Sequence, residues 1–221
     1  SEMCIRDSFV DGLDGLASGV VTIGGVAFFI YSYQLAVDTS PASYANLASL
    51  IIALLVGGCI GFLPHNFNPS RIFMGDSGSM LIGLLLAAST IRVTGQVDPA
   101  LLSNERVFAA YMPIILPLAV MALPLIDLFL AVVRRMAAGK SPFSADAKHL
   151  HHRMLRLGHS HARAVLIMYL WTADFAFGAI GFLLFPTDIV IIVVGISLLI
   201  TLAFTFYPVI ARRRYRREIT R

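Results

Sequence analysis

The sequence predicts an all-α integral membrane protein, a polytopic bundle of about six transmembrane helices. Of its 221 residues, 57% are hydrophobic and only 14% are charged, and the mean hydropathy is +0.80. A soluble domain is about 45–50% apolar and about 25% charged, so the composition excludes a soluble globular enzyme and a disordered chain. The two cysteines, Cys4 and Cys59, do not support a disulfide framework.

Six apolar segments carry the prediction of a helical bundle. They cover residues 16–37, 47–63, 80–93, 107–133, 164–185 and 189–210. A helix needs about 20 apolar residues to cross the hydrocarbon core. The short third segment is therefore expected to gain residues 77–79 and a few residues after Val93.

Two local patterns predict details within these segments. The fourth segment contains Pro113, Pro117 and Pro124, and prolines remove backbone donors, so kinks are expected there. In the second segment, Gly57 and Gly61 form a G-x-x-x-G pair. That pattern favours close contact between helices in lipid.

The basic residues predict the orientation of the chain. With six spans, residues 1–15, 64–79, 134–163 and 211–221 share one side, and they hold all but two of the 17 Lys and Arg residues. The positive-inside rule makes this side cytoplasmic. The basic tail, residues 211–221, is expected to anchor this topology against anionic lipid, so the net charge of +4 does not call for a nucleic-acid partner.

Carboxylates and histidines gather in three of these four segments. The first contains Asp11 and Asp14, which would share a face of a helix because they are three residues apart. Their presence on one side of the membrane with the other polar residues suggests one active site there. The alternative is a helix start with acidic residues near its dipole, and Gly12 and Gly15 in a turn.

The second polar segment precedes an apolar helix directly. Residues 75–79 read Gly-Asp-Ser-Gly-Ser, and such residues cap helix N-termini. The same geometry attracts phosphate, and Asp76 could hold Mg²⁺ against that phosphate. Asn66 and Asn68 lie in a proline-bounded turn, where either could contact a uridine or a sugar, or stabilise the turn.

The third polar segment is rich in histidine and basic residues. It contains His149, His151, His152, His159, His161, Lys148, Arg153 and Arg156. Structural zinc is disfavoured, because no cysteine and only Asp146 accompany these residues. Anionic phosphate oxygens suit the set better, and a solvated basic loop is the alternative. His159 and His161 are assigned no role in a site.

Two further carboxylates lie in apolar segments. Asp127 is near the inner end of the fourth span, where it should pair with Arg134 or Arg135 or face the site. Asp174 is in the fifth span, and the sequence assigns it no role.

The three polar segments together resemble the polyprenyl-phosphate N-acetylhexosamine-1-phosphate transferase family. The matching stretches are residues 11–17, 73–79 and 149–153, and their order between the spans matches as well. The resemblance extends from Phe9 to about the sixth span. The His-x-His-His-Arg stretch is similar to the bacterial undecaprenyl- or decaprenyl-phosphate N-acetylglucosamine-1-phosphate branch.

Two departures from the family pattern concern the start of the chain. Ser8 stands where the family usually has Asn, and no Asp-Asp dipeptide is found. The resemblance therefore implies a C-terminal fragment in which residues 9–210 are a partial transferase domain and 211–221 a cytoplasmic tail. Residues 1–8 are expected to be foreign or artefactual, and the fragment is not expected to be active alone.

The resemblance implies an enzyme at the cytoplasmic face of the bacterial inner membrane, with a homodimer among its expected forms. It would transfer N-acetylglucosamine-1-phosphate from UDP-N-acetylglucosamine to a membrane polyprenyl phosphate and release UMP. This is the first lipid-linked step of cell-wall or surface polysaccharide synthesis. The implied catalytic residues are Asp11, Asp14 and Asp76, with Asp76 as ligand of Mg²⁺ or, as an alternative, Mn²⁺. The implied substrate-binding residues are Asn66, His149, His151, His152 and Arg153.

Two alternatives remain open from the sequence. A phospho-N-acetylmuramoyl-pentapeptide transferase belongs to the same family. A non-enzymatic polytopic transporter belongs to another class, and it would have polar residues near mid-span and inverted repeats. Here the polar residues gather at one surface, and no repeat is seen.

Overall fold

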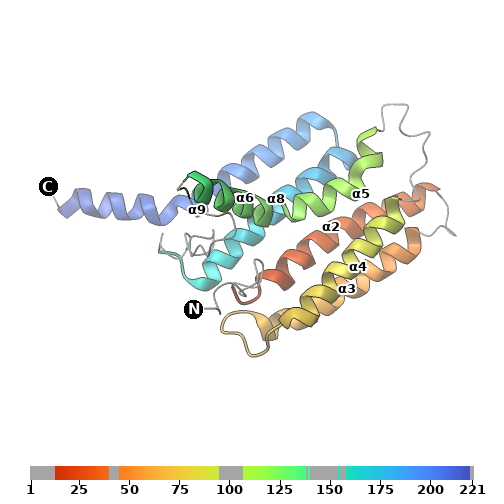
Figure 1. Ribbon diagram of the computed structural model, residues 1–221. Coiled ribbons are helices and arrows are strands. Elements are labelled where there is room, and N and C mark those ends of the chain that lie inside the picture. Colours follow the sequence, from red (N-terminus) through yellow and green to blue (C-terminus); the bar gives the residue numbers. More distant parts are fainter. Residues whose placement is uncertain are drawn as a thin grey trace.

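The computed structural model describes residues 13–39, 45–94, 107–137, 139, 154 and 158–219. Every regular element in these residues is an α-helix, as the composition predicts (Figure 1). The helices are α2 (Leu16–Thr39), α3 (Ala45–Asn66), α4 (Gly75–Thr94), α5 (Val107–Val120), α6 (Ala122–Ala137), α8 (His161–Leu184) and α9 (Thr187–Ile219).

Five of these helices are long and apolar enough to cross a membrane. Their candidate spans are Leu16–Leu35, Leu47–Asn66, Gly75–Thr94, His161–Leu184 and Thr187–Tyr207. They correspond to five of the six predicted spans. The third segment does gain residues at its start, because α4 begins at Gly75. By the length and composition of these helices, the chain is a multi-pass membrane protein.

The fourth predicted span, residues 107–133, is two helices, not one. The chain leaves regular helix at Met121, between the end of α5 and the start of α6. Pro124 has no N–H to donate to the carbonyl of Val120, so the helical ladder is interrupted at this point. The break confirms the predicted kink, and the ribbon changes direction there (Figure 1).

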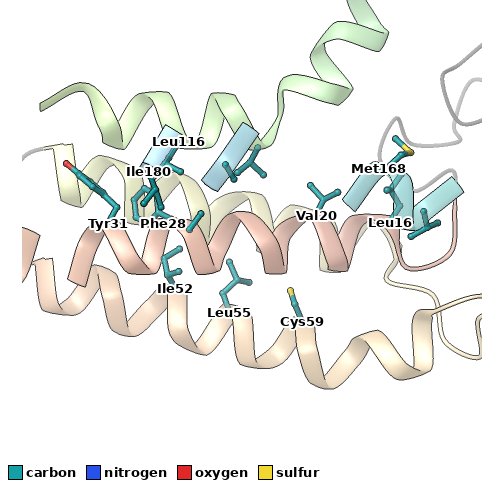
Figure 2. Packing of buried hydrophobic residues seen from close by; sticks show 14 of the residues in the cluster. Leu16, Val20, Phe28, Tyr31, Ile52, Leu55, Cys59, Leu116, Met168 and Ile180 are labelled. Atoms are coloured by element: carbon teal, nitrogen blue, oxygen red, sulfur yellow. The ribbon is translucent and has the colours of Figure 1, made fainter. Parts of the chain in front are cut away.

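Helix α2 lies at the centre of the bundle. It packs against α3, α8, α5 and α4. Its buried side chains meet those of α3, α5 and α8 in one apolar core (Figure 2). The side chains labelled there are Leu16, Val20, Phe28, Tyr31, Ile52, Leu55, Cys59, Leu116, Met168 and Ile180.

The outer helices keep large apolar side chains on the surface. In α4, Met80, Leu84 and Ile91 are each more than 60% exposed, and α9 exposes Ile192 and Leu199 in the same way. In water such faces would be costly, but lipid tails are as apolar as these side chains. The exposure pattern therefore agrees with helices that face a bilayer.

The glycines that bring helices close together are not the predicted ones. Among the residues that the structure describes, a Cβ atom added at Gly57 or Gly61 would meet no atom within 4 Å, so no described helix makes the predicted contact at this pair. Close contact is made by α2, where an added Cβ at Gly24 would lie 2.5 Å from Cγ2 of Val120. The spacing of two glycines does not reveal which face of a helix is covered.

This difference predicts opposite effects of alanine at the two places. Gly24→Ala should lower the free energy of unfolding by about 1–3 kcal/mol, because the stiff side chain of Val120 cannot move away. Gly57→Ala should have no such cost and should gain up to about 1 kcal/mol of helix propensity. Thermal unfolding in detergent would compare them, and equal effects would contradict the packing seen at Gly24.

A line of polar contacts joins α8 to α9. The carboxylate of Asp174 accepts hydrogen bonds from the hydroxyls of Ser197 and Thr201, the latter at 2.7 Å. Nearer the start of α8, Nε1 of Trp171 donates to Oγ1 of Thr205 at 3.3 Å. Asp174, to which the sequence assigned no role, thus links two helices inside the apolar region, where polar side chains need such partners.

Candidate functional site

The described parts of three polar segments lie at one end of the bundle. The beginning of α2, the turn from α3 to α4 and the beginning of α8 lie at the same end, because the helices alternate in direction (Figure 1). These are described parts of three of the four segments that were predicted to share a side. For this part of the chain, the shared side is confirmed.

Asn66 is the last residue of α3. Its side chain ties the turn of residues 13–15, here called the acidic turn, to α3. Its Oδ1 accepts hydrogen bonds from the backbone N–H of Gly15 and the hydroxyl of Ser18, both at 3.1 Å. Its Nδ2 donates to the carbonyl of Ile72 at 3.0 Å. The side chain is only 3% exposed, so its amide is directed to protein groups. Of the two roles considered for Asn66, the structure supports stabilisation of the turn rather than contact with a substrate.

Asp14 is held by the same turn. Its Oδ2 accepts a hydrogen bond from Nδ2 of Asn68 at 3.2 Å and one from the backbone N–H of Ser70 at 3.3 Å. The residue is half-buried, and its Oδ1 receives no donor from the described residues. Asp14 therefore makes a structural contact through one of its two carboxylate oxygens.

The turn after α3 leads directly to Asp76. The backbone N–H groups of Arg71 and Ile72 both donate to the carbonyl of His65, which closes the turn. Gly75 then starts α4 with a φ of +65°, a left-handed conformation that glycine adopts without strain. Asp76 lies exposed in the first turn of α4. The unpaired N–H groups of that turn make it a favourable place for phosphate.

The carboxylate oxygens among the described residues are the type of ligand that Mg²⁺ prefers. Within the ranges that the structure describes, no group of three or more His, Cys, Asp or Glu is placed to hold a metal ion. Mg²⁺ in phosphoryl-transfer sites commonly uses one or two carboxylates, and water and substrate phosphates complete its shell. The exposed carboxylate of Asp76 at a helix N-terminus fits that arrangement.

Several predicted site residues lie outside the described residues. They are Asp11, His149, His151, His152 and Arg153. The side chain of Asp127 is also outside the description, so its expected pairing stays a prediction. The approach of the histidine segment to Asp14 and Asp76 is likewise a prediction.

Sequence reasoning missed two residues that contact the acidic turn. Ser18 donates to Asn66 and to the carbonyl of Gly15. The hydroxyl of Tyr169, in α8, also donates to that carbonyl. A tyrosine in an apolar segment gives no signal by itself, since its ring suits any membrane helix.

The residues that form these turns match a known protein family. Residues 8–94 match the glycosyl transferase family 4 profile. We call these residues, which make up less than half of the chain, the family 4 segment. The family 4 segment contains the acidic turn, the turn after α3 and all of α4, so Asp14, Asn66 and Asp76 lie within it.

Individual proteins are similar to nearly the whole chain, beyond the family 4 segment. The decaprenyl-phosphate N-acetylglucosaminephosphotransferase of Mycolicibacterium smegmatis is 44% identical over 205 residues, 93% of this chain and 50% of the relative. That of Mycobacterium tuberculosis is 46% identical over 206 residues, 93% of this chain and 51% of the relative. A phospho-N-acetylmuramoyl-pentapeptide-transferase of Desulforudis audaxviator is 29% identical over 174 residues, 79% of this chain and 44% of the relative. The chain spans about half the length of these curated relatives.

The Asn66 contacts predict a marked loss of stability on truncation. Asn66→Ala should leave the N–H of Gly15 and the carbonyl of Ile72 without this partner, and a buried group left unpaired costs about 1–3 kcal/mol. Asn68→Ala is the matched control, because the side chain of Asn68 makes one hydrogen bond to the described residues and is half-buried. Thermal unfolding in detergent should show the larger fall for Asn66→Ala. Equal falls would contradict the role of Asn66 in holding the turn.

Proposed function

We propose that the full-length protein transfers N-acetylglucosamine-1-phosphate from UDP-N-acetylglucosamine to a membrane polyprenyl phosphate and releases UMP. One observation carries the proposal: the acidic turn of Asp14 is hydrogen-bonded to the turn that leads into Asp76. Two carboxylates from distant parts of the sequence therefore belong to one fixed unit at one end of a membrane bundle. That unit lies within a family 4 segment.

The central difficulty of this reaction is that an anionic phosphate must approach an anionic diphosphate. The N-terminus of α4 attracts phosphate through its free N–H groups and its dipole. Asp76 would hold Mg²⁺ at this point, and the bound ion would neutralise charge on the diphosphate. Asp76 is exposed, so a diphosphate can reach it.

Asp14 and Asp11 would position or activate the lipid phosphate. In the transfer, a lipid phosphate oxygen forms a bond to the phosphorus that carries the sugar, and the bond from that phosphorus to the UMP oxygen breaks. A phosphate monoester has a second pKa near 6, so the lipid phosphate is largely ionised at neutral pH and needs no strong base. This favours direct attack over an aspartyl-phosphate intermediate, and it gives Asp14 an orienting role.

The histidine segment would hold the diphosphate or the sugar phosphate. His149, His151, His152 and Arg153 supply donors suited to phosphate oxygens. This assignment rests on the residue types and on the resemblance of the segment to the family. Asn66 is proposed as a positioning residue, since its amide bonds to the protein.

The relatives support N-acetylglucosamine as the transferred sugar. Identity to the two decaprenyl-phosphate N-acetylglucosaminephosphotransferases is 44% and 46%, against 29% for the phospho-N-acetylmuramoyl-pentapeptide-transferase. The sugar is therefore proposed to be N-acetylglucosamine, and the muropeptide substrate is the competitor that the assay must include.

A transfer assay tests the proposal directly. Membranes that contain the full-length protein would receive polyprenyl phosphate and UDP-N-acetylglucosamine labelled in the sugar, with and without Mg²⁺. Label should enter the lipid phase only with Mg²⁺, and UMP should appear in equal amount. Unlabelled UDP-N-acetylmuramoyl-pentapeptide should not compete. Transfer from the muropeptide instead would overturn the sugar assignment, and no transfer from either donor would overturn the function.

The proposed location is the bacterial inner membrane, with the site on the cytoplasmic side. The excess of Lys and Arg in the segments at this end supports that orientation. Reporter fusions or cysteine labelling after Ile219, and in residues 95–106, should report opposite sides. Homodimer formation stays a prediction, which cross-linking in native membranes would test.

A further inference from the structure

The acidic turn has a third support, which comes from outside the family 4 segment. The hydroxyl of Tyr169, in the third turn of α8, donates a hydrogen bond to the carbonyl of Gly15. The two residues are 154 positions apart in the sequence. Gly15 directly follows Asp14, so this contact fixes the backbone one residue beyond the carboxylate.

Gly15 is bound at both of its backbone polar groups. Its N–H donates to Asn66, and its carbonyl accepts from Tyr169, from the hydroxyl of Ser18 and from the N–H of Gly19. Its φ of +82° lies in the left-handed region, where a side chain would be strained. The turn is thus defined by contacts from α3 on one group and from α8 on the other.

The ring of Tyr169 fits against a surface that only glycine leaves open. A Cβ atom added at Gly19 would overlap the ring, and one added at Gly15 would lie 3.5 Å from the hydroxyl oxygen. Gly15 and Gly19 are four residues apart, so they form the close-contact pair of a G-x-x-x-G pattern. This pair, with Gly15 directly before α2 and Gly19 in its first turn, admits an aromatic side chain from α8.

We propose that Tyr169 is a positioning residue that sets the location of Asp14 for the transfer reaction. The inference rests on the proposed function, because it assigns Tyr169 a role in that same site. Its physical basis is that the hydroxyl holds the carbonyl of Gly15, the residue that follows Asp14, against α8 and so limits where the backbone at Asp14 can lie. Small displacements of positioning groups cost large factors in rate, about 10²-fold for 1 Å.

Tyr169→Phe in the full-length protein tests this role with minimal change of shape. The ring remains against Gly19, and only the hydrogen bond to Gly15 is lost. We expect kcat to fall by about 10- to 100-fold, while KM for UDP-N-acetylglucosamine changes by less than about twofold. Thr205→Val is the matched control, since it removes a hydroxyl that bonds to α8 at Trp171, away from the acidic turn. It should leave kcat within about twofold.

Hydrogen exchange gives a readout that needs no activity. In Tyr169→Phe, amides of residues 13–20 should exchange about tenfold faster, while those of 187–207 remain unchanged. Normal kcat in Tyr169→Phe, or an equal loss in Thr205→Val, would overturn the positioning role. Unchanged exchange at residues 13–20 would overturn it even if transfer slowed. If the unaltered protein shows no transfer, the proposed function fails, whereas the exchange rates still decide whether Tyr169 holds the turn.

Discussion

Replacement of Asp76 by asparagine in the full-length protein is expected to abolish sugar-phosphate transfer, with a loss of about 10³-fold or more. Asparagine keeps the size and the helix-start preference of aspartate, so α4 should still begin at Gly75. What is lost is the negative charge that would hold Mg²⁺ against the diphosphate. The residual rate, measured against Mg²⁺ concentration in the transfer assay, should no longer show saturation by the metal.

The chain offers a closely matched control for this substitution. Asp188 also lies exposed in the first turn of an apolar helix, α9, but at the opposite end of the bundle. Asp188→Asn should retain normal transfer, which would separate the site from a general effect on helix starts. If Asp76→Asn folds normally and keeps near-normal turnover, Asp76 is not the metal ligand.

Two substitutions of Asp14 separate the effect of its negative charge from the effect of its hydrogen bonds. Asp14→Asn keeps an acceptor oxygen for Asn68 and Ser70 but removes the charge. Transfer should fall by about 10²-fold or more, the size typical of an electrostatic group at the reacting centre, with little change in the unfolding temperature. Asp14→Ala should lose transfer as well, and removal of the acceptor should cost a further 1–3 kcal/mol or so of stability.

The comparison of these two variants decides what Asp14 does. Both would be purified in detergent, with the unfolding temperature and the transfer rate measured on the same preparation. If Asp14→Asn is fully active and only Asp14→Ala fails, the carboxylate serves the fold alone. The proposal would then have to place the lipid phosphate at Asp11, outside the described residues.

The helices were predictable because their length and composition determine them. Each long apolar segment is helical, the fourth as two helices, and the extension of α4 before Met80 followed from the thickness of a bilayer. The interruption between α5 and α6 followed from the missing N–H of Pro124. These features depend on properties of one segment at a time, so the sequence is sufficient for them.

Contacts between segments were harder to predict from the sequence. Both Gly57 and Gly19 belong to G-x-x-x-G pairs, but only Gly19 faces another helix closely. In a lipid-facing protein both faces of a helix are apolar, so hydrophobic periodicity does not identify the buried one. This is the physical reason why the sequence pointed to Gly57 rather than Gly19, and why the contact of Tyr169 with Gly15 was not foreseen.

In the candidate site, too, residue types were predictable from one segment, whereas their contacts with other segments were not. Asp14 and Asp76 were found by their residue type and their position beside apolar segments, and the structure brings their two turns into one unit. Asn66 was found as well, but its two possible roles could be distinguished only by its partners. His159, which was given no role in the site, is buried and contacts the carbonyl of Thr205 at 3.0 Å.

The contact between Gly15 and Tyr169 also bears on the order in which the protein is made. The ribosome adds about 5–20 residues per second, so the 154 residues between these positions take about 8–30 s to synthesise. During that interval α2 and α3 can already pack together through Asn66. The carbonyl of Gly15 cannot accept the hydrogen bond of Tyr169 until α8 has entered the membrane. The acidic turn therefore acquires its final form late in biogenesis, and a nascent chain that ends before Tyr169 carries both carboxylates without the last of their supports.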